Sequence, residues 1–102
     1  MSYQEVAEEL QAQNPDVKLS QMFGMPVLKI NRKAFAGDWH GAMVFKMTGE
    51  SHAKALKLEG AELFDPGMGR PMKEWVVVPQ ELSDKWLALA IAALEYVETL
   101  TK

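Results

Sequence analysis

The residues best suited to bind a ligand stand in the stretch FDPGMGRPMKEW at positions 64–75. Gly67 and Gly69 precede Arg70 there, and such a segment is typical of either a phosphate-binding loop or a tight turn. A phosphate-binding loop offers backbone N–H groups at the start of a helix, whereas this segment contains two prolines and leads into a strand pattern. The sequence therefore predicts a turn with positive φ at the glycines, and it leaves Arg70 as a candidate loop contact, for an anion or for a neighbouring carboxylate such as Asp65.

Residue types used in catalysis or metal binding are present but are not grouped. The chain has no cysteine, and neither His40 nor His52 has a second ligand at metal-binding spacing. Asp38 lies two residues before His40, but a triad would also need a serine beside the histidine, and the serines are better placed as helix caps or loop residues. We expect no catalytic residue, no metal and no cofactor, and hence no enzymatic activity.

Lysines and a tryptophan recur at alternate positions of segments with a strand pattern, so a sheet would gather them on one face. The last strand has two possible registers, of which one adds Lys73 and Trp75 to this face and the other adds the alternate residues of the same strand. The first register makes a basic patch with one aromatic, the minimum for binding single-stranded nucleic acid, and the second makes an apolar surface for a protein partner. The candidate interaction surface is Val27, Lys29, Val44, Lys46, Lys73 and Trp75.

The elements that would position these residues follow from changes in hydrophobic periodicity. Ser2 and Glu5 have capping-box spacing at the start of a helix that ends before Asn14-Pro15. A short helix is predicted over residues 50–58 and a long closing helix over residues 82–100. The predicted strands cover residues 25–30, 34–39, 42–47, 61–64 and 72–78.

This order, αβββαββα, predicts an α+β fold with an antiparallel sheet of about five strands and helices packed mainly on one face. Trp86 begins the apolar stripe of the closing helix, so we expect it to be buried against the sheet. Val27 and Val44 would then lie on the outer face, where water normally meets polar side chains. A weak homodimer that covers them is the simplest explanation.

The composition is that of one ordinary globular domain spanning residues 1–102. Apolar residues make up 48% and charged residues 25% of the chain, and the formal net charge is -3. This charge gives no general attraction to nucleic acid or to anionic lipid, although a local basic patch remains compatible with it. The longest apolar run, at 86–94, is shorter than the ~20 residues that span a bilayer, and the N-terminus lacks a signal-peptide pattern, so we expect a cytoplasmic protein without membrane contact.

Three segments, MFGMPVLKINRKAFAG, AMVFKM and GAELFDPGMGRPMKEWVVVP, resemble the N-terminal domain of the TfoX competence regulators and related YjbR-like small proteins. The resemblance covers about Met22 to Pro79 and is most specific in Phe23-Gly24 and in the run from Gly69 to Trp75. It implies an antiparallel sheet flanked by helices, a regulatory or binding role, and no agreed catalytic centre. We therefore expect an interaction module that acts through protein contacts; the alternative is a nucleic-acid-binding accessory protein in transcription or competence regulation.

Overall fold

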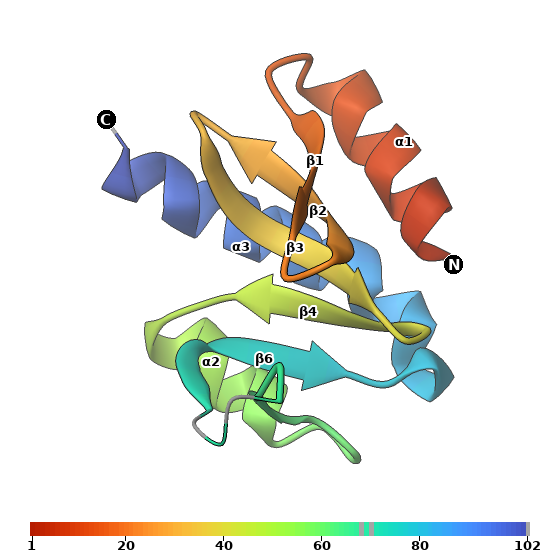
Figure 1. Cartoon of the computed structure of the whole chain (residues 1–102), viewed down its shortest axis with the longest axis vertical. Helices are drawn as coiled ribbons and strands as arrows, with labels where there is room; N and C mark the ends of the chain where they lie inside the picture. The colour runs from red at the N-terminus through yellow and green to blue at the C-terminus, as the bar shows by residue number, and fades with distance from the viewer. Residues whose placement is uncertain (68, 70, 102) are drawn as a thin grey trace.

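The computed structural model describes residues 1–67, 69 and 71–101. Three α-helices are present among these residues, α1 (Tyr3–Gln13), α2 (Gly49–Leu56) and α3 (Trp86–Leu100), and a 3-10 helix, η1 (Gln80–Lys85), precedes α3. The strands are β1 (Lys18–Met22), β2 (Met25–Ile30), β3 (Lys33–Trp39), β4 (Ala42–Lys46), β5 (Glu62–Phe64) and β6 (Met72–Val78). They form one antiparallel sheet in the order β1-β2-β3-β4-β6-β5 (Figure 1).

The α+β class and the antiparallel sheet are confirmed. The sheet has six strands and not about five, since the sequence pattern did not predict β1. β1 reads KLSQM, in which polar residues separate Leu19 from Met22 without a regular alternation. It is an edge strand, and Leu19 is 61% exposed, so little apolar burial is needed to hold it in place. Backbone pairing with β2 holds β1 in the sheet, since its side chains bury little apolar surface.

The helices lie close to the predicted positions, with two corrections. The closing α-helix begins at Trp86 and not at residue 82, because residues 80–85 form the 3-10 helix η1. The capping box of α1 is confirmed, since the Ser2 hydroxyl accepts from the Glu5 N–H while the Glu5 carboxylate accepts from the Ser2 N–H. α2 ends at Leu56 and not at Leu58, and Gly60 adopts a φ of +87° in the turn before β5.

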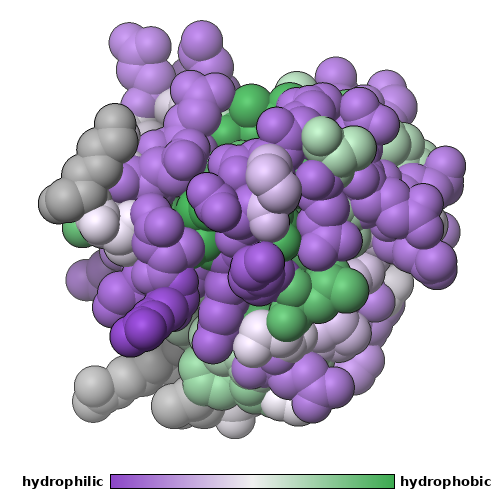
Figure 2. All heavy atoms as spheres, turned by 90° about the horizontal axis from the view of Figure 1, so that it is seen from above, coloured by the Kyte–Doolittle hydropathy of each residue, from purple (hydrophilic) through white to green (hydrophobic). Residues whose placement is uncertain are grey.

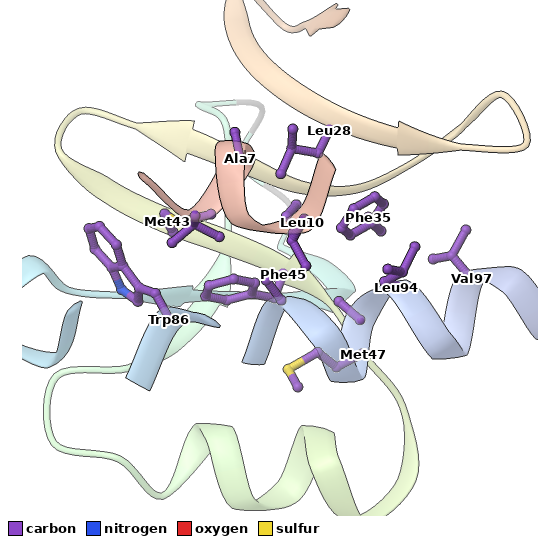
Figure 3. Close-up of a cluster of buried hydrophobic side chains, with 14 of the residues drawn as sticks. Ala7, Leu10, Leu28, Phe35, Met43, Phe45, Met47, Trp86, Leu94 and Val97 are labelled. Carbon is purple, nitrogen blue, oxygen red and sulfur yellow. The ribbon is translucent and has the colours of Figure 1, made fainter. Parts of the chain in front are cut away.

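The main core lies between the sheet and the helices. α3 and α2 lie behind the sheet in Figure 1, and α1 flanks the end formed by β1 and β2. Trp86 is 2% exposed, as expected, and its indole N–H donates to the Val78 carbonyl at 3.3 Å. Figure 3 shows Trp86, Leu94 and Val97 of α3 lying along the aromatic residues Phe35 and Phe45 of the sheet.

A β-bulge in β3 changes which residues face the helices. The pairing of β2 with β3 shifts between Leu28 and Lys29, so Phe35 is an extra residue between two paired ones. Simple alternation would place Ala36 opposite to Phe35, yet both belong to the main core. Asp38, which pairs with Met43, therefore also faces the helices.

The outer face of the sheet carries a second core, which corrects the expectation of an exposed apolar surface. Val27 and Val44 are 0% exposed, and Trp75 is 5% exposed. They pack with Met25 of the β1–β2 hairpin and Phe64 of β5, and Figure 1 shows β1 passing in front of β3. The twisted β1–β2 hairpin and the short edge strand β5 thus cover the face that a partner was expected to cover.

Exposed apolar side chains are few and separated in the described part of the chain. The large ones are Met1 and Leu100, near the two ends of the chain, and Leu19 and Phe23, in the hairpin of β1 and β2. The face seen in Figure 2 is accordingly mostly hydrophilic, with small and separate hydrophobic areas. The prediction of a homodimer rested on an exposed patch at Val27 and Val44. Since both side chains are buried within the chain, that patch is not available to a partner.

Candidate functional site

A basic groove crosses the outer face of the sheet at the end where the β2–β3 hairpin turns. Its volume is about 280 Å³. The residues that line it are Met22, Lys29, Arg32, Lys33, Ala34, Lys46, Met72 and Trp75. They come from five of the strands and one turn, so only the folded sheet brings them together.

The strand pairing explains why these residues meet. Lys29 of β2 lies opposite Ala34 of β3, and Lys46 of β4 lies opposite Trp75 of β6. Neighbouring strands are ~4.8 Å apart, so the step from β2 to β4 separates the two lysines by about 10 Å across the sheet. The groove is therefore a band of positive charge and not a point at which all cations converge.

The floor of the groove is apolar and its rim is charged. Trp75 is almost completely buried, and the side chains of Met22, Ala34 and Met72 are half-buried around it. Lys29 and Lys46 are half-buried as well, which places their aliphatic stems along the floor and their ammonium groups at the rim. Arg32 and Lys33 are exposed at the open end.

Among the described residues, four cations line the groove, Lys29, Arg32, Lys33 and Lys46, and no carboxylate does. Within the described residues, none of the four makes an ion pair or a side-chain hydrogen bond. Five of the nine basic residues that the structure describes, and all fourteen acidic residues, lie elsewhere. An acidic protein thus concentrates unpaired positive charge at one place, where it attracts anions.

The structure brings together half of the predicted interaction surface. Lys29, Lys46 and Trp75 line the groove, and the register that turns Trp75 to the outer face is the one observed, since Trp75 packs with Val27 and Val44. Lys73 is exposed and does not line the groove; it lies in an irregular stretch of β6, since the pairing with β5 shifts between Met72 and Val76. Val27 and Val44 lie buried beneath, and Arg70 lies outside the described residues.

Sequence reasoning missed five of the eight lining residues, namely Met22, Arg32, Lys33, Ala34 and Met72. Arg32 and Lys33 stand in a segment that was treated only as the turn between two strands. A hairpin turn directs its side chains to the ends of the strands that it joins, so these two cations extend the row begun by Lys29. Met22 belongs to the strand that the sequence pattern did not reveal.

The remaining candidate residues have structural partners. His52 donates from Nε2 to the Lys73 carbonyl oxygen at 2.7 Å, and the ring of His40 packs edge-on against Trp39 at a centroid distance of 4.4 Å. Among the described residues, no group of three or more histidine, aspartate or glutamate side chains is arranged to hold a metal ion. Gly67 and Gly69 adopt φ of +96° and +75°, as predicted for a turn.

Asp65 accepts a hydrogen bond from the Gly67 N–H at 2.9 Å. This bond closes a local turn and occupies one of the backbone donors that an anion would need there. The glycine loop leads into β6 and not into a helix, so it also lacks a helix dipole.

Two tyrosines on the helical side have raised pKa values. Burial, and secondarily the charge of Asp38, raises the pKa of Tyr3 to about 12. The pKa of Tyr96 is raised chiefly because its hydroxyl donates to the Glu74 carboxylate, and burial adds to the effect. Both side chains join a helix to the sheet, since Tyr3 begins α1 and Tyr96 belongs to α3.

Comparisons of the chain with models of protein families, with curated proteins and with solved structures give no match. The resemblance to the TfoX N-terminal domain thus stays a prediction. In the part of the chain that the structure describes, no helix combines the length and the apolar character needed to cross a bilayer.

Proposed function

We propose that this protein is a non-enzymatic binding module that holds single-stranded nucleic acid in the basic groove. The observation that carries the proposal is the row of four cations without an ion pair, on an open sheet face, in a chain of net charge -3. Holding like charges together without counter-charges is unfavourable, and a bound polyanion relieves the repulsion.

The shape of the groove supports a polymer over an enclosed small molecule. Its volume of about 280 Å³ lies just below the ~300–1,000 Å³ of typical small-molecule pockets. Its cations are spread over β2, the following turn and β4. A chain of phosphates can contact such a row one after another, with a base against the half-buried Met22 and Met72 of the floor.

The distribution of charge supports a single strand over a duplex. Proteins that read duplex DNA commonly place a basic helix in the major groove. Neither α1 nor α3 contains a lysine or an arginine, and both carry glutamates. The surfaces of α1 and α3 therefore repel phosphate, which favours the sheet face as the binding side, as in other proteins that bind single strands on a sheet.

The regulatory role implied by the resemblance to the TfoX N-terminal domain agrees with this proposal. Binding of an acidic protein segment is the alternative use of the same cations. This alternative agrees with the protein contact expected from the sequence. The two functions can be told apart by competition, because an acidic polypeptide would displace a bound protein segment from the groove. The experiment therefore includes a polyglutamate competitor.

The test is fluorescence anisotropy of a labelled oligothymidylate of about 20 nucleotides, titrated with the full chain in about 50 to 200 mM salt. We expect binding whose log K falls linearly with log salt, with a slope of about -2 to -3 for three or four phosphate contacts at ~0.7 each. The double variant Lys29→Gln/Lys46→Gln should weaken binding by about tenfold or more and reduce the slope by about 1.4.

The matched control is Lys54→Gln/Lys57→Gln, which removes the same charge at the end of α2, outside the groove. Equal losses for the two double variants would show that only net charge matters and would contradict a site in the groove. Displacement of the oligonucleotide by polyglutamate at an equal concentration of charge would favour an acidic protein partner instead.

A further inference from the structure

Three hairpins of two-residue turns join β1 to β4, and all of their turn residues have positive φ. The turns are Phe23-Gly24, Asn31-Arg32 and His40-Gly41, with φ values of 55° and 74°, 50° and 70°, and 50° and 88°. Positive φ at both positions defines the type I′ turn, in which glycine is strongly preferred at the second position. The chain follows this preference in the first and third turns and departs from it at Arg32.

Arg32 is held in this conformation by the residues around it. Ile30 and Lys33 pair directly across the turn, which fixes a loop of two residues. Asn31, a residue that tolerates positive φ, donates from its side chain to the Thr101 hydroxyl at 2.9 Å and so ties the turn to the end of α3. The backbone of Arg32 therefore has no freedom to relax to negative φ.

The Arg32 side chain does not stabilise the fold through polar contacts. It is exposed, and in the described residues it makes neither a hydrogen bond nor an ion pair. Its position at the open end of the basic groove is its one evident role, since it lines the groove beside Lys33. An unfavourable backbone conformation with no structural return is typical of a functional residue.

We infer that Arg32 is a phosphate-contacting residue of the basic groove, kept at a glycine position at the expense of fold stability. This inference rests on the proposed function, because it takes the groove as the binding site. The guanidinium can hold a phosphate with two parallel N–H···O bonds, a geometry that a lysine ammonium does not offer. Arg32 thus anchors the nucleic-acid backbone at the β2–β3 turn, and the lysines contact the phosphates that follow.

The test is the Arg32→Gly variant, measured both for stability without ligand and for binding of oligothymidylate. Thermal unfolding should shift upward by about 2 to 6 °C, because glycine removes the left-handed strain. Affinity at about 100 mM salt should fall by about fivefold, and the salt slope should become smaller by about 0.7, the share of one phosphate contact. Stability and binding should therefore change in opposite directions.

Two further variants separate strain from charge. Arg32→Lys keeps the strain and the charge, so its thermal midpoint should equal that of the wild type, its salt slope should be retained, and its affinity should fall by only about twofold. His40→Asn relieves strain in the third turn, away from the groove, so it should raise the thermal midpoint without changing the affinity.

The outcomes distinguish the inference from the function on which it rests. Wild-type binding with an unchanged affinity in Arg32→Gly would overturn the role of Arg32 and leave the groove as the site. A lower thermal midpoint for Arg32→Gly would overturn the claim that the positive φ of Arg32 destabilises the fold. Absence of wild-type binding at about 50 mM salt would overturn both the inference and the proposed function.

Discussion

Some side chains in this protein stabilise the fold, and others do not stabilise it but are positioned by it. Trp86 belongs to the first group, since it is buried under α3 and its indole N–H has a partner on β6. Arg32 belongs to the second, since it has no partner and a strained backbone. Substitutions at these two positions should therefore have opposite effects on stability.

Trp86→Ala should lower the free energy of unfolding by about 3 to 5 kcal/mol. The loss combines the removed apolar surface, the cavity that remains beside Phe45 and the Val78 carbonyl left without its donor. Urea unfolding of both proteins measures it. A loss below about 1 kcal/mol would mean that α3 does not pack on the sheet through this residue.

Tyr3 should make stability fall at alkaline pH. Its pKa in the folded state is raised from 10.0 to about 12, so between these values the unfolded chain loses its proton while the folded chain keeps it. This contribution is complete below pH 10 and is lost as pH rises towards about 12; because Tyr3 is only half-buried, it amounts to about 1 kcal/mol.

Tyr3→Phe isolates this effect from the titration of the lysines. Urea unfolding at about pH 9 and about pH 11 should show a smaller loss of stability for Tyr3→Phe than for the wild type. The same loss in both proteins would show that the tyrosine hydroxyl does not lie in the buried site beside Asp38.

At the scale of the elements, hydrophobic periodicity and the signals at helix ends predict five of the six strands and all three α-helices. α2 buries only Ala55, so its prediction depends on the signals at its ends. Periodicity fails for β1, whose pairing is made by the backbone at a sheet edge. It also fails at Phe35 and Ala36, where a bulge places two successive residues on one face. Neither feature leaves a signal in the alternation of residue types.

The same limits explain what could be predicted of the site. Lys29, Lys46 and Trp75 follow from alternation within strands, so they were found. The cover over Val27 and Val44 depends on the curl of a twisted hairpin and on β5, which are tertiary features. The turn residue Arg32 gained its role only when the strands on both sides had been placed.

Val44→Glu tests the second core. On an exposed face this change would leave the fold intact, but Val44 is 0% exposed, so the carboxylate would be buried without a partner. We expect the free energy of unfolding to fall by about 3 kcal/mol or more.

Leu19→Glu is the matched control for Val44→Glu, because it places the same charge on strand β1 at a side chain that is 61% exposed. It should cost less than about 0.5 kcal/mol. Circular dichroism and urea unfolding of the two variants provide the comparison. A folded Val44→Glu protein of normal stability would mean that the hairpin opens easily from the sheet.

The molecule as a whole separates its charges between two sides. The sheet face has the basic groove, whereas α1 and α3 contain glutamates and no basic residue. A nucleic acid approaching this molecule is therefore attracted by one side and repelled by the other, which orients it before contact. The net charge of -3 limits non-specific binding elsewhere on the surface.

Orientation can be measured with single labels, because the chain contains no cysteine. Lys73→Cys places a fluorophore at an exposed position of β6, two residues before Trp75 of the groove floor, and Glu95→Cys places one on the exposed side of α3. Addition of oligothymidylate at about 50 mM salt should change the emission of the first label and leave that of the second unchanged. Raising the salt to about 200 mM should remove the change, because phosphate contacts are lost as counterions return. Equal responses of both labels would mean that the oligonucleotide binds without a preferred side, and the separation of charge would then have no part in recognition.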